Sequence, residues 1–144
     1  VWRLVFVILV GMRYVIFTFL FLGLLTPLVA QVADNTAVLA PDKPFENILV
    51  KPLQADSLQS VFVIWVKKEV PAHVHKEHTE TIVVLEGKAL MTLNDSLIHI
   101  KKGMVLTIPT GTVHSVISVK SRKPLKVLSI QSPFFDGKDR FFVE

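Results

Sequence analysis

Short hydrophobic runs separated by turn signals fill the chain from Phe45 onward. The runs are rich in Val, Ile, Leu and Phe, which favour strands, and turns recur about every 8 to 12 residues. No stretch of about ten residues keeps the 3.6-residue period of a helix. The pattern therefore predicts an all-β sandwich or barrel, with strands in FENILVKPL, LQSVFVIWVKK, ETIVVLEG, ALMTL, LIHI, VLTI, VHSVISV, LKVLSIQ and RFFV.

The turn residues support this interpretation. Asn94-Asp95, between ALMTL and LIHI, is typical of a hairpin turn. Two sheets folded on each other would enclose one small core, lined by the inward positions of the strands. Residues 31–44 form a polar, proline-containing lead-in without a clear period, and we expect residues 45–144 to form the barrel.

The apolar excess of the chain is concentrated in residues 1–30, where Arg3 and Arg13 are the only charged residues. A start at Met12 would give a short secretory signal, cleaved before Gln31. The alternative is an uncleaved membrane anchor, and then residues 1–30 would be the only contact with a membrane. Either interpretation predicts an exported domain, periplasmic or extracellular.

Composition excludes some classes of protein. Of the 16 basic residues, two lie in the apolar segment, so the remainder carries only a small excess over the 12 acidic residues. No basic run with interleaved aromatic residues is present, and we therefore expect no nucleic-acid binding. The 144 residues suit a single domain. Because the chain has no cysteine, disulfides and a lipid-modified cysteine are excluded.

Candidate chemistry is concentrated in HVHKEHTETIVVLEG, residues 73–87. His73 and His75 fall on the same side of a strand, because successive side chains alternate. Glu80 has the wrong parity to join them unless the chain bends within residues 76–79. By itself the segment is either a metal site or a hydrated strand end.

A second segment, GMVLTIPTGTVH, places another histidine after a turn. Gly103 precedes an apolar strand, and Pro109 and Gly111 form a turn that reverses the chain. His114 then begins the next strand. The two segments together favour a metal site over a hydrated strand end.

Together the segments resemble the two motifs of the cupin superfamily, as in its small single-domain members. The first motif, G-x5-H-x-H-x3-4-E-x6-G, and the second, G-x5-P-x-G-x2-H-x3-N, match in order and spacing at His73, His75, Glu80, Gly87, Gly103, Pro109, Gly111 and His114. Lys67 replaces the leading glycine and Ser118 the final asparagine. Neither position is a metal ligand in the family.

The resemblance implies a jelly-roll β-barrel that holds one divalent ion through His73, His75, Glu80 and His114. Three imidazoles and one carboxylate suit Mn, Fe, Co, Ni, Cu or Zn without choosing among them. It also implies a small-molecule ligand or substrate and a possible homodimer formed through the sheets.

Other candidates have competing interpretations. His78 could be a substitute ligand or a weak catalytic acid-base candidate, but its loop setting favours a surface histidine. His99 is expected to face outward from its strand. Trp65 either lies at the barrel mouth or is a core or rim aromatic. For Asp139 and Arg140, a solvated ion pair is favoured over a role in a pocket. Four aromatic residues of the tail are expected to form a closing strand and hydrophobic cover: Phe134, Phe135, Phe141 and Phe142.

Two functions fit this sequence. The first is a metal-dependent enzyme for a small oxygenated substrate, of the isomerase, dioxygenase, decarboxylase or lyase type. The second is a metal-containing module that binds or senses a sugar or organic acid without turnover. The enzyme is slightly favoured, although the fold hosts many functions.

Overall fold

The computed structural model describes residues 39–143. This part of the chain contains strands and no helix, so nothing in it is a helix long and apolar enough to cross a membrane. The ten strands are β1 (Ile48–Ala55), β2 (Ser60–Val66), β3 (Val70–Val74), β4 (Thr79–Glu86), β5 (Lys88–Leu93), β6 (Ser96–Lys101), β7 (Val105–Ile108), β8 (His114–Val119), β9 (Leu125–Ser132) and β10 (Phe141–Phe142).

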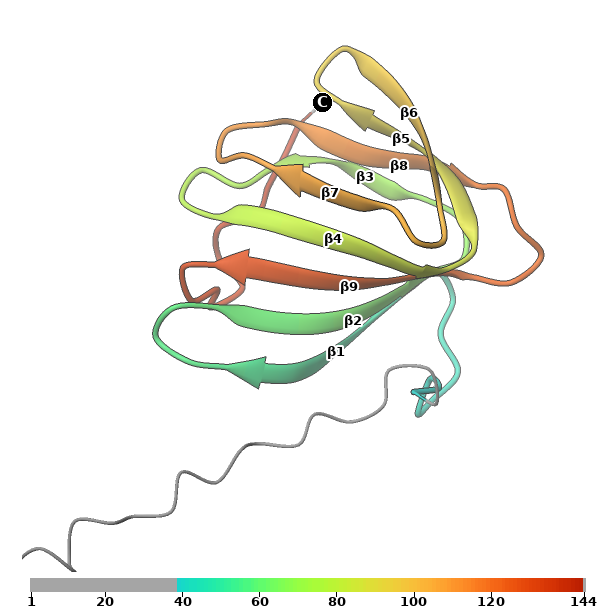
Figure 1. Cartoon of the computed structure of the whole chain (residues 1–144), viewed down its shortest axis with the longest axis horizontal. Helices are drawn as coiled ribbons and strands as arrows, with labels where there is room; N and C mark the ends of the chain where they lie inside the picture. Colours follow the sequence, from blue (N-terminus) through green and yellow to red (C-terminus); the bar gives the residue numbers. More distant parts are fainter. Residues whose placement is uncertain (1–38, 144) are drawn as a thin grey trace, which may run out of the picture. The chain divides into compact units, whose positions relative to one another are not determined.

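The strands form two antiparallel five-stranded sheets (Figure 1). The first has the order β1-β2-β9-β4-β7 and the second the order β10-β3-β8-β5-β6. Consecutive strands often lie in different sheets, as in a jelly roll. The predicted all-β fold class is confirmed, and so is the closing strand at the end of the chain, because β10 pairs with β3.

The main core lies between the two sheets. Alternation along the strands directs one side chain in two inward, as in β4, where Ile82 and Val84 are buried and Val83 is only partly covered. The largest fully buried apolar side chains of this core are Met91, Ile100, Ile108 and Leu125.

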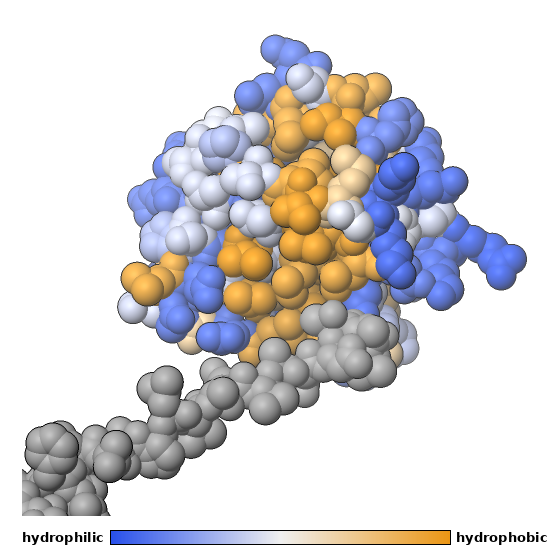
Figure 2. All heavy atoms as spheres, in the orientation of Figure 1, coloured by the Kyte–Doolittle hydropathy of each residue, from blue (hydrophilic) through white to orange (hydrophobic). Residues whose placement is uncertain are grey.

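The outer face of the first sheet carries a second, smaller hydrophobic cluster. Leu49, Val63 and Trp65 are buried in it, and Leu39 of the lead-in and Phe45 pack against them. Trp65 therefore belongs to this outer cluster and not to the barrel mouth. In the orientation of Figure 1, hydrophobic residues form a band across this side of the molecule (Figure 2).

Two turns show why their residues are needed. Asn94-Asp95 is the predicted hairpin turn, since Leu93 pairs with Ser96 and Asn94 adopts a positive φ of 47°. Gly87, between β4 and β5, has a φ of 85°, and a Cβ there would lie 3.0 Å from the Leu125 backbone. Glycine is the residue that tolerates both conditions.

Predictions for residues 1–30 and most of the lead-in lie outside the described residues. The described residues 39–143 belong to one compact unit.

Candidate metal centre

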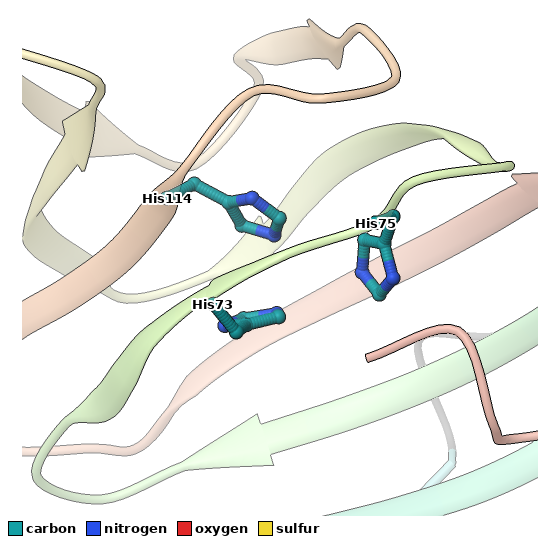
Figure 3. A group of neighbouring side chains, drawn as sticks. All are labelled: His73, His75 and His114. Atoms are coloured by element: carbon teal, nitrogen blue, oxygen red, sulfur yellow. The ribbon is translucent and has the colours of Figure 1, made fainter. Parts of the chain in front are cut away.

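Three histidines, two in the second sheet and one directly after β3, face one another between the two sheets. His73 of β3 lies directly opposite His114, the first residue of β8. His75 follows β3 by one residue, and its carbonyl accepts a hydrogen bond from the Gly111 N–H at 2.7 Å. This hydrogen bond joins the turn of the second motif to the backbone of the first motif at His75. One ligand atom from each ring lies within 4.8 Å of the others (Figure 3).

Glu80 reaches the cluster from the opposite sheet. The chain bends at residues 76–77, as predicted, and then enters β4 of the first sheet. The alternation of side chains along a single strand therefore does not relate Glu80 to His73 and His75, because the chain changes sheets at this bend. Glu80 Oε2 lies 3.3 Å from His114 Nε2 and 3.8 Å from His75 Nε2. The structure brings together all four side chains that the motifs single out.

Each of the three rings is oriented through Nδ1. His73 Nδ1 donates to the Pro71 carbonyl at 2.9 Å and His114 Nδ1 to the Thr112 carbonyl at 3.0 Å. His75 Nδ1 donates to the Asp139 carbonyl. A ring whose Nδ1 carries the proton presents a lone pair at Nε2. The Nε2 atoms of His75 and His114 are buried and have no hydrogen-bond partner among the described residues.

The electrostatics of the cluster favour deprotonated donors. Burial, followed by the neighbouring His114, lowers the pKa of His73 to about 4. Burial also lowers the pKa of His75. Burial by itself would raise the pKa of Glu80, but contacts with His114 and Ser129 outweigh it and lower this pKa to about 2. At neutral pH, His73 and His75 are therefore neutral and Glu80 is a carboxylate.

Two residues of β9 hold Glu80 in place. Ser129 Oγ donates to Glu80 Oε1, and Gln131 Nε2 lies 3.5 Å from the same oxygen. Both supporting side chains are buried. Sequence reasoning missed them, although polar residues at alternate positions of the apolar run LKVLSIQ were a usable signal.

His78 differs from the surface histidine that we expected. Only 4% of the residue is exposed. Nδ1 lies 2.6 Å from Asp139 Oδ2, and Nε2 lies 2.9 Å from the Phe134 carbonyl. Burial would lower the pKa of His78, but these two acceptors raise it. Both ring nitrogens face acceptors, an arrangement that favours the imidazolium and leaves neither nitrogen free for a substrate proton.

Asp139 corrects a second prediction, the solvated ion pair with Arg140. It is 5% exposed and accepts the backbone N–H groups of residues 76–78 as well as His78 Nδ1. Burial would raise the pKa of Asp139, but His78 and these N–H groups lower it to about 2. Because its own carbonyl holds His75 Nδ1, Asp139 ties the C-terminal tail to the histidine cluster.

The remaining candidates agree with the sequence only in part, because Phe134, Phe141 and Phe142 are exposed and do not form the hydrophobic cover that we expected. His99 is exposed on β6. In the tail, Phe135 forms a hydrophobic cover, with its ring edge-on to His75 and His78 at centroid distances of 5.6 and 5.1 Å. Phe142 lies 6.2 Å from the ring of His73.

A mostly apolar cavity opens beside the cluster. His73, Glu80 and His114 contribute to its wall, with Ile64, Met91 and Val127 among its apolar residues. Its volume is about 70 Å³. A ligand held wholly inside this cavity would therefore be small.

The donor set fits a divalent transition metal. Imidazole nitrogens and a carboxylate suit the later first-row ions. The Nε2 atoms of His75 and His114 have no hydrogen-bond partner among the described residues and could coordinate such an ion. Hydrogen bonds behind each ligand are typical of metal sites. His73, His75, Glu80 and His114 are the residues that would hold the ion.

Residues 60–131, half of the chain, match the cupin domain family. The chain belongs to the cupin family. Its jelly-roll architecture agrees with that assignment, so the expectation drawn from the two motifs is confirmed.

Individual proteins resemble this cupin in sequence or in fold. An uncharacterized protein of Aquifex aeolicus is 35% identical over 99 residues, which cover 69% of this chain and 80% of that protein. A Klebsiella pneumoniae protein with a double-stranded β-helix domain has a TM-score of 0.61 at 20% identity, covering 71% of this chain and 90% of its own. Pac13, a nucleoside dehydratase from Streptomyces, has a TM-score of 0.59 at 18% identity, covering 69% and 82%.

Proposed function

We propose that this cupin binds one divalent transition metal ion through His73, His75, Glu80 and His114 and uses it to act on a small oxygenated molecule. The observation that carries the proposal is the orientation of the imidazoles. Each Nδ1 donates to a backbone carbonyl, so the Nε2 lone pairs are left for a ligand. A bound ion would supply Lewis-acid polarisation of a substrate oxygen.

The protein's own residues would prepare this site in three ways. The backbone carbonyls fix the tautomer of each histidine, and Ser129 holds the Glu80 carboxylate. Burial keeps His73 neutral near pH 7, so protons compete little for it. The apolar wall of the cavity would exclude bulk water from a bound substrate.

The proposal also includes turnover, so that the protein would be an enzyme. The nucleoside dehydratase among the structural neighbours supports an enzyme, and the reaction would be of the isomerase, dioxygenase, decarboxylase or lyase type. The second candidate function is a binding or sensing module without turnover. It is favoured by one observation: both nitrogens of His78, the acid-base candidate, contact other groups of the described residues, so this ring has no nitrogen to exchange a proton with a substrate.

Export and a homodimer complete the proposal. Export is supported by the apolar segment of residues 1–30 and its cleavage signal. A homodimer is supported by the apolar outer face of the first sheet, where Val105 is 63% exposed.

Metal content tests the assignment. We expect the purified wild type to hold one ion per chain after dialysis, measured by elemental analysis, and His73→Ala and His114→Ala to lose it. His99→Ala, which removes an exposed histidine, is the matched control and should keep the wild-type content. Retention of the ion by both alanine variants would show that the site is elsewhere.

Turnover is tested separately. Protein reconstituted with each metal is incubated with a panel of sugars and organic acids, and substrate consumption is followed by mass spectrometry. Conversion supports the enzyme. Binding without conversion supports the binding module.

A further inference from the structure

Arg140 lies where the inner cavity meets the outer surface. It lines the cavity that contains His73 and His114, and it also lines an adjoining outer pocket beside Gln131 and Phe135. Among the described residues that line the inner cavity, Arg140 alone carries a permanent positive charge. A ligand passing from solvent toward the histidines would pass this guanidinium.

The guanidinium is paired with no carboxylate of the described residues 39–143. Its Nε is buried without a hydrogen-bond partner, and among the described residues its side chain makes no ion pair. Its central carbon lies 6.0 Å from the ring centroid of Phe135. The neighbouring carboxylates are engaged elsewhere, Asp139 with His78 and Asp136 with Lys138 at 2.7 Å. A buried donor left unpaired is unfavourable, so a ligand that satisfies it would gain affinity.

The charge balance of the site also favours an anion. Three neutral imidazoles and one carboxylate around a divalent ion would leave a net charge of +1, and Arg140 adds another positive charge. An acidic ligand would offset this positive potential.

A second polar group faces the same space. Gln131 lines the outer pocket, and its buried Oε1 has no hydrogen-bond partner among the described residues. It can accept a hydrogen bond from a ligand hydroxyl. The pocket thus offers a cation and an acceptor close together.

We propose that Arg140 binds the carboxylate of a small hydroxycarboxylic acid, so that this cupin acts on or senses hydroxy acids in preference to their neutral counterparts. The inference deepens the proposed function and rests on it, since another oxygen of the acid would face the metal ligands. Guanidinium and carboxylate match as a two-bond pair, which a neutral amide cannot reproduce. Gln131 is placed to accept the hydroxyl of such an acid.

The test compares acids with their amides. Zinc-loaded protein is titrated calorimetrically with glycolate, 3-hydroxybutyrate and malate, and with the matching amides of each. We expect at least one acid to bind wild type ten- to one-hundredfold more tightly than its amide, on the order expected for a charged hydrogen bond. Arg140→Gln should lose that preference, and Arg140→Lys should keep part of it.

Arg122→Gln is the matched control, because it makes the same change at an exposed arginine that lines neither pocket. It should keep the wild-type preference. Circular dichroism and thermal unfolding check that each variant folds, and Arg140→Lys carries the test if Arg140→Gln does not fold. The proposal is overturned if Arg140→Gln retains the preference for acids, if folded Arg140→Lys matches Arg122→Gln in full, or if wild type prefers no acid to its amide.

Zinc stoichiometry is measured on every sample and separates the two proposals. A wild type without zinc contradicts the metal assignment, whatever the acids do. A wild type with one zinc and no preference for acids contradicts only the role of Arg140.

Discussion

His75 and His78 lie on either side of one bend, yet their rings have opposite surroundings. His75 donates from Nδ1 to the Asp139 carbonyl, and its buried Nε2 has no partner. His78 donates from both nitrogens, to the Asp139 carboxylate and the Phe134 carbonyl. Asp139 thus contacts both rings. It leaves Nε2 of His75 free to bind a ligand, whereas Asp139 and the Phe134 carbonyl together occupy both nitrogens of His78.

The comparison separates two roles that histidine commonly has in proteins. A ring with one nitrogen occupied is neutral and has a donor pair for a metal. A ring with both nitrogens on acceptors is a cation that cross-links the elements around it. Here the cation joins the bend after β3 to the tail before β10, and the tail then covers the histidine cluster.

Substitution of Asp139 should have the largest effect. Asp139→Asn removes the charge that pairs with buried His78, and breaking such a pair costs about 3–5 kcal/mol. Chemical denaturation of the metal-free protein should report this loss. Asp136→Asn is the control, because that carboxylate belongs to the same tail but forms an exposed pair with Lys138. Equal stability of Asp139→Asn and Asp136→Asn would contradict the role of Asp139.

Substitution of His78 should destabilise less and leave the metal in place. His78→Gln removes two hydrogen bonds, but Asp139 keeps three backbone N–H donors. We expect a loss of about 1–3 kcal/mol with an unchanged metal content. His99→Gln should change neither quantity. Loss of the ion from a folded His78→Gln variant would place His78 among the ligands and remove the distinction from His75.

The sequence predicted the fold and the four clustered residues for physical reasons. Hydrophobic alternation and turn residues decide where strands lie, because burial and backbone geometry act locally. His73 and His114 are 41 positions apart in the printed numbering, but the two motifs carry spacing that the family resemblance made readable. The bend before Glu80 was also predictable, since four polar residues separate it from His75.

The partners of these residues could not be predicted in the same way. Whether Asp139 pairs with His78 or with Arg140 depends on how the tail packs. The sequence does not distinguish these two partners, because both are polar residues that can carry a positive charge. Ser129 and Gln131 support Glu80 through pairing between β4 and β9, which no local pattern specifies. Trp65 likewise required knowledge of which face of β2 the second sheet covers.

Changes of pH should alter the stability of the metal-free protein with opposite signs for the two kinds of histidine. Burial lowers the pKa of folded His73 to about 4. The unfolded chain therefore takes up this proton first, and the stability of the metal-free protein falls as pH drops from about 6.5 to about 4. Burial opposes the rise for His78, but its acceptors raise the folded pKa. Its contribution is complete below about 6.5 and is lost as pH rises through the folded value.

Imidazole nitrogen NMR spectra of the metal-free protein between pH 4 and 8 would resolve the two signs. At pH 6 we expect the signals of His73 to be those of a neutral ring protonated at Nδ1, and those of His78 to be those of an imidazolium. His78→Gln should remove the loss of stability on the alkaline side and keep the loss on the acidic side. A His78 that is neutral at pH 6 would mean that the Asp139 carboxylate does not hold it charged, and the tail would then need another explanation for its position over the cluster.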